Sequence, residues 1–243
     1  LFTCFLLYRN YLRYNKEAKK VKLENEILEI EKNTLKGVVS ESSKNIENVL
    51  NRSIKIFNIT TDGISKSNIQ LLKKNSRQVT KLSDEVDELQ ENIFNYLKSN
   101  KKANKIATDF YLIILEKLTQ ITKKLRRISK ITLKHVDDDR RKLPLSNIKI
   151  LLSLDLNFKN LFESVINIFI NKDFKKIEDV LLDIIQARDE IENQIKRHKE
   201  ENQDNKRYDK LHLEILSLCS EILNALKQLL ENYYSIKSET ELK

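Results

Sequence analysis

Residues 110–151 read FYLIILEKLTQITKKLRRISKITLKHVDDDRRKLPLSNIKIL and hold the pattern that decides the fold. The first part repeats apolar residues at spacings of three and four, which predicts an amphipathic helix that ends near His135. Residues 136–146, VDDDRRKLPLS, then interrupt this pattern with alternating charge and the only proline of the chain. Because the apolar spacing resumes afterwards, we expect a boundary between two helical units here.

Apolar spacing of the same kind continues on both sides of this stretch. On the N-terminal side it predicts a helix over about residues 38–59, ended by Thr61-Asp62-Gly63, then a longer helix to about Leu97, before the one that starts near Ala103. On the C-terminal side it predicts helices over about residues 147–171, from a cap at Asp173 to about Glu200, and over about residues 208–236. Three helices before the break and three after it indicate a duplicated unit.

Glycine and proline are almost absent, with Gly 2 and Pro 1 in 243 residues. Average usage is about 7% and 5%, and sheets and tight turns need both residues as punctuation. We therefore predict an all-α fold of two tandem three-helix bundles preceded by a membrane-proximal helix. The expected units are residues 1–36 for the membrane-proximal part, 37–136 for the first bundle and 145–243 for the second.

The N-terminal segment, LFTCFLLYRNYLRYNKEAKK, is apolar over its first eight residues and basic afterwards. A secretory signal has its positive charge before the apolar run, and eight residues are too few for a bilayer, which needs about 20. Apolar, aromatic and then basic residues are typical of a transmembrane helix that leaves the membrane on its cytoplasmic side. We interpret residues 1–8 as the end of such a helix, with an apolar arm packed on the domain as the alternative.

The net charge of +9 is concentrated in two segments. Residues 1–22 carry six basic residues against Glu17, and residues 123–142 carry nine against three aspartates. Anionic lipid headgroups attract basic residues next to a membrane helix at about 1 kcal/mol each, whereas no nucleic-acid-binding signature accompanies the charge. A solvated helix end, favoured by the helix dipole, is the alternative for the second segment. The candidate membrane or partner contacts are Arg9, Arg13, Lys16, Lys19, Lys20, Lys123, Lys124, Arg126 and Arg127.

No pattern of catalytic or metal-binding residues occurs in the sequence. Cys4 and Cys219 are too few and too isolated for a disulfide framework or a metal site, and the three histidines have no ligand spacing. A glycine-rich phosphate loop and an H-E-x-x-H motif are both missing. We therefore expect no enzymatic activity and no cofactor.

Two segments resemble proteins of phosphate uptake. Residues 79–93, VTKLSDEVDELQENI, resemble the signature of PhoU-family domains, which are tandem three-helix bundles linked to the control of phosphate uptake. Residues 110–151 resemble the cytoplasmic tail of bacterial PiT-family inorganic phosphate transporters, which carry a PhoU-like module after the last membrane helix. The resemblance implies a place on the cytoplasmic face of the inner membrane and contact with the transmembrane core of the same transporter.

PhoU domains bind metal clusters through carboxylates at positions i and i+4 on two helices of each bundle, a spacing that puts both on one helix face. Of the matching positions here, only Asp87 and Glu192 keep a carboxylate, and Lys123 and Arg188 add positive charge, so we expect no bound metal. A shift of the alignment by one turn would use an acidic helix face that includes Asp84 and Glu91, which is otherwise a solvated face. The eight matching positions are Ser83, Asp87, Thr119 and Lys123, then Arg188, Glu192, Ser220 and Asn224.

The function that these observations favour is that of a non-catalytic regulatory or assembly domain of an inorganic phosphate transporter. A membrane-tethered helical signalling or scaffold domain is the alternative, and a homo-oligomer is compatible with either. The sequence upstream of Leu1 would distinguish the two, because a transporter predicts many apolar spans there and a receptor one or two.

Overall fold

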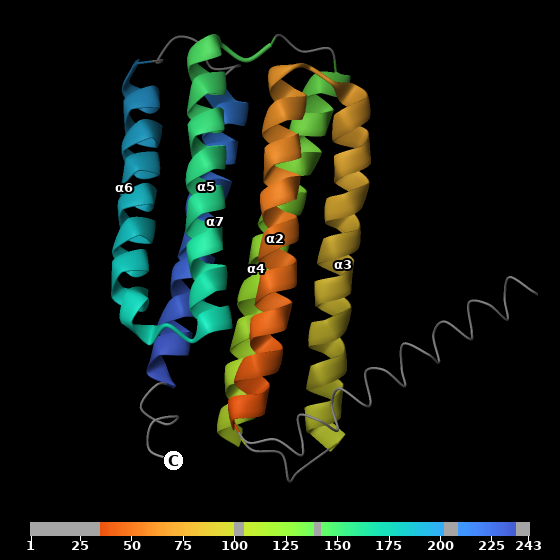
Figure 1. The fold of residues 1–243 in the computed structure, drawn as a ribbon. Helices are drawn as coiled ribbons and strands as arrows, with labels where there is room; N and C mark the ends of the chain where they lie inside the picture. Colours follow the sequence, from red (N-terminus) through yellow and green to blue (C-terminus); the bar gives the residue numbers. More distant parts are fainter. Residues whose placement is uncertain (1–34, 100–104, 139–141, 202–208, 237–243) are drawn as a thin grey trace, which may run out of the picture.

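The computed structural model describes residues 35–99, 105–138, 142–201 and 209–236, none of which forms a strand. The predicted all-α fold class, with three long helices on each side of the break, is confirmed (Figure 1). Pro144 lies directly before the first helix of the second half, where its missing N–H costs nothing. The elements are α2 (Leu35–Ser65), α3 (Ile69–Ser99), α4 (Lys105–Asp137), α5 (Leu145–Asn171), the 3-10 helix η1 (Phe174–Lys176), α6 (Ile177–Glu201) and α7 (Asp209–Ser235).

The first three helices form an antiparallel bundle in which each helix packs against the other two. Their apolar stripes meet inside it, and residues such as Leu50, Leu82 and Leu115 are almost completely buried. Full burial of one such side chain contributes about 1.5–3 kcal/mol relative to exposure. The stripes predicted from the spacing of three and four therefore form the core of this half.

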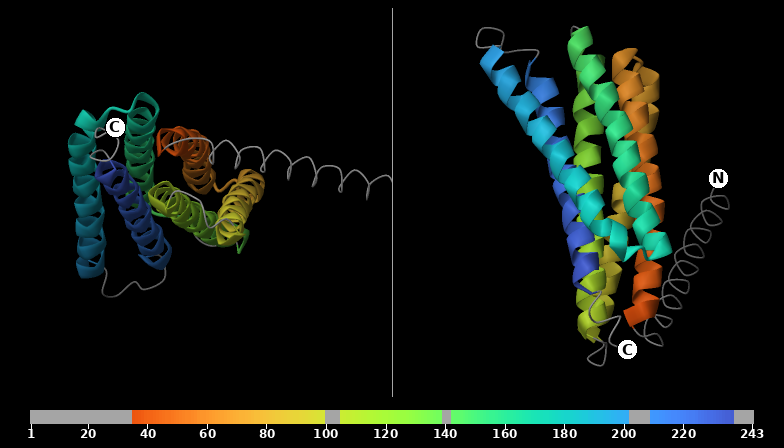
Figure 2. Two further views of the ribbon diagram at one scale, coloured as in Figure 1. Left: turned by 90° about the horizontal axis from the view of Figure 1, so that it is seen from below. Right: turned by 60° about the vertical axis from the view of Figure 1, so that its left-hand side comes forward.

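The second half is packed differently, because its helices pack against the first half as extensively as against one another. α6 packs on α7, but α5 makes its main contact with α2, and α7 packs extensively on α4. Seen along the helix axes, α2 lies beside α5 and α4 beside α7, with α3 and α6 at opposite ends (Figure 2). The buried residues of both halves belong to one hydrophobic cluster. The break in the sequence thus separates two sets of three helices that share a core.

Aromatic side chains stack both between the halves and inside the second half. Phe57 of α2 stacks on Phe158 of α5 with ring centroids 4.8 Å apart. Tyr233 of α7 stacks on Phe169 of α5 at 4.1 Å and on Phe174 at 4.8 Å. Burial raises the pKa of Tyr233 to about 12, which keeps its hydroxyl neutral. Such stacks contribute about 0.5–1.5 kcal/mol beyond the area that they bury.

Two hydrogen bonds accompany the Phe57–Phe158 stack between α2 and α5. The Asn58 Nδ2 group donates to the Asp155 carboxylate at 2.7 Å, and the Ser43 hydroxyl donates to the backbone carbonyl of Phe169 at 3.1 Å. Burial raises the pKa of Asp155, while the hydrogen bond from Asn58 and the charge of Lys159 lower it. These polar contacts fix how α5 lies along α2.

Gly63 does not end the first helix, contrary to the expectation from Thr61-Asp62-Gly63. α2 continues to Ser65, and the chain turns at Ser67, whose φ of 51° lies in the left-handed region. The Asn68 side chain then caps α3 by accepting a hydrogen bond from the Leu71 N–H at 3.0 Å. Gly63 instead allows a close approach, because a Cβ there would lie 2.6 Å from the Leu72 Cδ2 atom.

Asp173 begins the connection to α6 but does not cap it through its side chain. Lys172 adopts a left-handed φ of 55° that ends α5, and the short helix η1 intervenes before α6. The Asp173 carboxylate forms an ion pair with the Lys176 ammonium at 3.1 Å. Asp173 therefore does not form the predicted capping hydrogen bond, although the boundary between the two helices lies where we expected it.

No helix within the described ranges is both long enough and apolar enough to cross a membrane. The described ranges do not include the predicted end of a membrane helix at residues 1–8, the predicted membrane-proximal helix or the first basic segment. The basic residues concerned are Arg9, Arg13, Lys16, Lys19 and Lys20.

The close contact at Gly63 leads to a prediction about stability. We expect Gly63→Val to lower the free energy of unfolding by about 1–3 kcal/mol, because the added methyl groups would collide with the buried Leu72. Urea unfolding followed by circular dichroism measures this change. Lys55→Val, at an exposed position of the same helix, controls for helix propensity. An equal cost of Gly63→Val in a Leu72→Ala background would contradict the proposed collision.

Candidate functional site

The four candidate contact residues of the second basic segment lie on α4, the helix that touches α2, α3 and α7. Leu125 and Ile128 are buried in the core. The four basic residues beside them come in two pairs with a spacing of three, which places the members of each pair on the same edge of the helix. One pair is Lys123 with Arg126, and the other is Lys124 with Arg127. α4 therefore has a buried apolar stripe with a cationic edge on each side.

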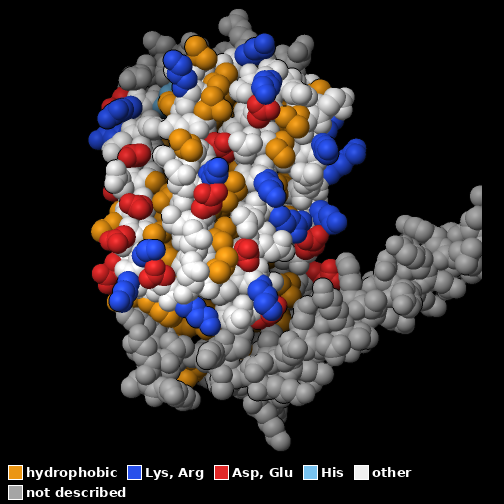
Figure 3. Space-filling model, in the orientation of Figure 1, with side chains coloured by type: hydrophobic (Ala, Val, Ile, Leu, Met, Phe, Trp, Pro, Cys, Tyr) orange, Lys and Arg blue, Asp and Glu red, His pale blue; other side chains and the backbone are white. Residues whose placement is uncertain are grey.

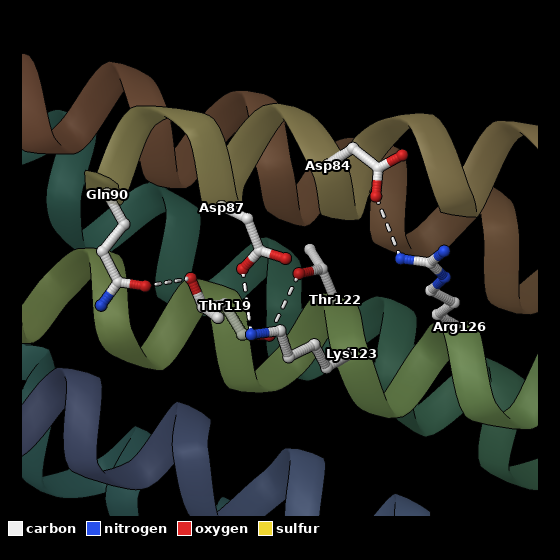
Figure 4. Close-up of polar contacts among 7 residues, drawn as sticks. All are labelled: Asp84, Asp87, Gln90, Thr119, Thr122, Lys123 and Arg126. Carbon is white, nitrogen blue, oxygen red and sulfur yellow. Dashed lines mark hydrogen bonds and ion pairs between the residues drawn. The ribbon is translucent and has the colours of Figure 1, made fainter. Parts of the chain in front are cut away.

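The first cationic edge faces α3. The Lys123 ammonium forms an ion pair with Asp87 at 3.1 Å, and the Arg126 guanidinium forms one with Asp84 at 3.0 Å (Figure 4). Each advance of three residues on α4 is matched by three residues back along α3, as an antiparallel pair of helices requires. We call this line of polar contacts the α3–α4 seam.

The same register extends along the whole length of the α3–α4 seam. Near its end, the Lys73 ammonium lies 3.3 Å from the Asp137 carboxylate. On the other side of Lys123, the Thr119 hydroxyl donates to the Gln90 side-chain oxygen at 3.1 Å (Figure 4). Three ion pairs and the Thr119–Gln90 hydrogen bond thus lie along one contact between the two helices.

The second cationic edge faces α7 and therefore joins the two halves. Arg127 donates to one oxygen of Glu214 from its Nε at 2.9 Å and from its Nη2 at 2.7 Å. Lys124 forms an ion pair with Glu221. Such partly exposed pairs contribute little to stability, about 0–1 kcal/mol each. Their main effect is to fix the register of α7 on α4.

Each of the four basic residues predicted on α4 thus has an acidic partner inside the fold. They keep partial access to solvent, and the side chains of Lys123 and Arg127 are 56% and 55% exposed. The sequence did not reveal the partners, because they lie on other helices. The only sign of these partners in the sequence was that Asp84 and Asp87 are three residues apart, as are the basic residues of each pair on α4.

The register of the α3–α4 seam shows where the residues predicted at PhoU-like ligand positions on α3 and α4 lie. Asp87 faces Lys123, but Thr119 faces Gln90, so its neighbour on the α3 face is Glu91. Ser83 lies one turn away in the opposite direction, fully buried, and its hydroxyl has no hydrogen-bond partner among the described residues. Asp87 therefore takes part in the seam, whereas the Ser83 hydroxyl makes no hydrogen bond across it.

The equivalent positions in the second half meet between α6 and α7, a contact that we call the α6–α7 seam. Arg188 reaches across it, with Nη1 3.4 Å from the Asn224 side-chain oxygen, and its Nη2 donates to Glu192 at 3.0 Å. Counting four residues along each helix from this contact places Glu192 opposite Ser220. The α6–α7 seam therefore holds the Arg188 guanidinium beside the Glu192 carboxylate.

Within the described residues, no group of three or more histidine, cysteine or acidic side chains could hold a metal ion. The fold does bring His198 and His212 together, with ring centroids 5.2 Å apart, although their separation in sequence gave no sign of it. Cys219 is fully buried, and burial raises the pKa of its thiol. A buried neutral thiol is a poor nucleophile and a poor ligand.

A hollow of about 610 Å³ lies over α3 beside Leu133 of α4. Its wall carries both signs of charge in equal number, so it offers no preference for an anion or a cation. The charged residues that line it are Lys73, Arg77, Lys81, Asp84, Glu85 and Glu88. The two seams remain the more distinctive arrangement, because their positions correspond between the halves.

Comparison with known proteins gives no family assignment. No protein-family model matches the chain, and no curated protein matches it.

The contact between the halves can be tested through Arg127 and Glu214. We expect a double-mutant cycle of Arg127→Gln and Glu214→Gln to give a coupling free energy of about 0.5–1 kcal/mol at low salt, because the pair is partly exposed. The coupling should fall in about 1 M NaCl, where screening shortens the range of the charges. Urea unfolding provides the free energies. A coupling that does not change with salt would contradict the ion pair.

Proposed function

We propose that the chain is the non-catalytic regulatory or assembly domain of an inorganic phosphate transporter of the PiT family, and that its two halves are PhoU-like. The observation that carries this proposal is the correspondence between the α3–α4 and α6–α7 seams. In each half the seam lies between the second and third helices, at the positions that the resemblance assigns to metal ligands. Each seam retains one carboxylate, at Asp87 or Glu192.

The cations in the seams give this correspondence a physical meaning. A metal ion in a PhoU domain balances carboxylates that project from two helices. Here the Lys123 ammonium balances Asp87, and the Arg188 guanidinium balances Glu192. The Lys123–Asp87 pair joins α4 to α3 without any bound ion, whereas Arg188 joins α6 to α7 through Asn224 and pairs with Glu192 on its own helix. Under this proposal the domain keeps the PhoU architecture and has no need of the metal.

The proposed partners follow from the same family context. The transmembrane core of the same transporter is one, and the anionic surface of the inner membrane on its cytoplasmic side is the other. The basic residues before residue 23 would contact that surface. The ion pairs on α4 weaken the case for the second basic segment, since acidic residues within the fold already balance its charge.

Phosphate uptake by the producing cells tests the proposed function. We expect deletion of residues 35–236 from the chromosomal gene to change the rate of radiolabelled phosphate uptake by about fivefold, the lower end of typical coupling between a regulatory and a functional site. Sulfate uptake in the same cells serves as the control and should not change. Immunoblotting of the transporter separates an effect on activity from an effect on assembly.

The proposal is wrong if phosphate uptake and the amount of transporter both stay the same after the deletion. A deletion that abolishes a response to an extracellular stimulus while phosphate uptake persists would support the signalling or scaffold alternative instead. Either result can be interpreted whether the domain activates or inhibits transport.

A second prediction tests the relationship of the α3–α4 seam to a metal site. Lys123→Glu would place a third carboxylate beside Asp87 and Glu91, and oxygen ligands of this kind bind Mn²⁺. We expect the variant to be less stable than the native chain without metal, because like charges then face each other. Mn²⁺ at 1 mM should restore about 1 kcal/mol or more by binding only the folded state. Thermal unfolding with and without Mn²⁺ measures the effect.

Lys55→Glu is the matched control, since it makes the same change of charge at an exposed position of α2 away from the seam. Mn²⁺ should leave its stability unaltered. Equal stabilisation of both variants would show that the ion binds without regard to the seam, and the proposed equivalence with a metal site would fail.

A further inference from the structure

α6 is attached to the rest of the fold mainly through α7. It packs along α7, and it makes smaller contacts with α5 and with η1, which directly precedes it. The two extensive contacts between the halves do not involve α6, because they join α5 to α2 and α7 to α4. In Figure 2, α6 also diverges from α5 toward its own C-terminal end. The position of α6 therefore depends on how well it packs against α7.

The side of α7 that faces α6 is identified by two contacts. The Tyr234 hydroxyl donates to Glu178 at 3.2 Å, and the His212 ring lies 5.2 Å from the His198 ring, measured between centroids. Three leucines that begin one turn after His212 and end one turn before Tyr234 lie on the same side. We call them the α7 leucine row: Leu216, Leu223 and Leu230, which are seven residues apart and completely buried.

α6 faces this row with a repeat of the same length. Its isoleucines are seven residues apart and therefore lie on one face of the helix. They are Ile177, Ile184 and Ile191, each completely buried. The next position of the repeat is His198, so the apolar series stops before the helix ends at Glu201. Two facing repeats of seven resemble the packing of a short coiled coil.

The contact with α7 becomes more polar toward the C-terminal end of α6. Three residues after each isoleucine, the inward-facing position changes from Val180 to Ala187 and then to Gln194. The Gln194 Oε1 atom is buried and accepts no hydrogen bond from the described residues, and the buried Arg188 Nε atom likewise has no acceptor. A buried polar atom without a partner costs free energy. The beginning of α6 is thus held by apolar packing, and its end is held more weakly.

The solvent side of α6 does not compensate for this weakness. The edge of the molecule over α6 gathers acidic side chains (Figure 3). Asp179 and Asp183 are both exposed and lie one turn apart on the helix. Like charges at this spacing destabilise a helix.

We infer that α6 is a detachable helix, which opens from its C-terminal end and uncovers the α7 leucine row. Ile177 and η1 keep the start of α6 in place. α7 stays on α4 while α6 opens, because its contact with α4 is separate and includes the pair of Arg127 with Glu214. The opening changes the apolar surface of the chain and leaves the shared core intact. Local openings of this kind are typical of elements that move in regulation. The inference does not depend on the proposed function.

Hydrogen exchange of the full 243-residue chain, followed by mass spectrometry of its peptides, tests the opening. We expect the amides of residues 192–201 to exchange at least about tenfold faster than those of residues 128–137, the last ten residues of α4. This comparison allows for fraying, since both segments end a long helix. Equal exchange of the two segments would overturn the inference.

Gln194→Leu tests the cause of the opening. The change removes the unpartnered oxygen and places an apolar side chain against α7, so we expect exchange of residues 192–201 to slow about tenfold. Asn193→Leu is the matched control, because it introduces the same side chain at the neighbouring exposed position. It should not slow exchange. The inference also fails if both variants have the same effect, since the gain would then come from helix propensity and not from the contact with α7.

Discussion

The packing of α4 between α3 and α7 is the contact on which the rest of the structure depends. The apolar stripe of α4 is covered by helices from both halves, and its two charged edges are held by acidic residues on either side. Burial supplies the free energy, because it removes apolar surface from water. The ion pairs add little energy, but they allow only one antiparallel register for α3 and one for α7.

The shared core has a mechanical consequence for the two halves. Two bundles joined by a linker would move independently, as domains with small polar interfaces do. Here the stack of Phe57 on Phe158 and the contact of Arg127 with Glu214 tie the halves at two separate pairs of helices. A force applied to α2 therefore reaches α5 directly through packed side chains. This rigidity suits a domain whose proposed role is to change the behaviour of an attached protein.

α5 occupies an unusual place in this arrangement. It contacts α2 of the other half more extensively than it contacts α6 or α7, so one of its faces is used within the chain. Its opposite face carries Leu152 and Leu156 in solvent, which costs free energy unless another surface covers it. Exposed acidic side chains are fewer on α5 than on α6. Because α5 is displaced toward α2, the two halves share a core and the outer face of α5 is left uncovered.

The sequence by itself determined the helices and the break, because apolar spacing and the scarcity of glycine and proline act locally along the chain. It could not determine the role of Gly63, because that role depends on how closely Leu72 approaches it in space. Nor could it determine which helical turn of α3 brings Asp87 to Lys123. The partners of the basic residues on α4 were also hidden, since they lie on other helices. Contacts between helices depend on register and on which faces meet, and only the tertiary structure decides these, because a helix repeats its spacing identically at every turn.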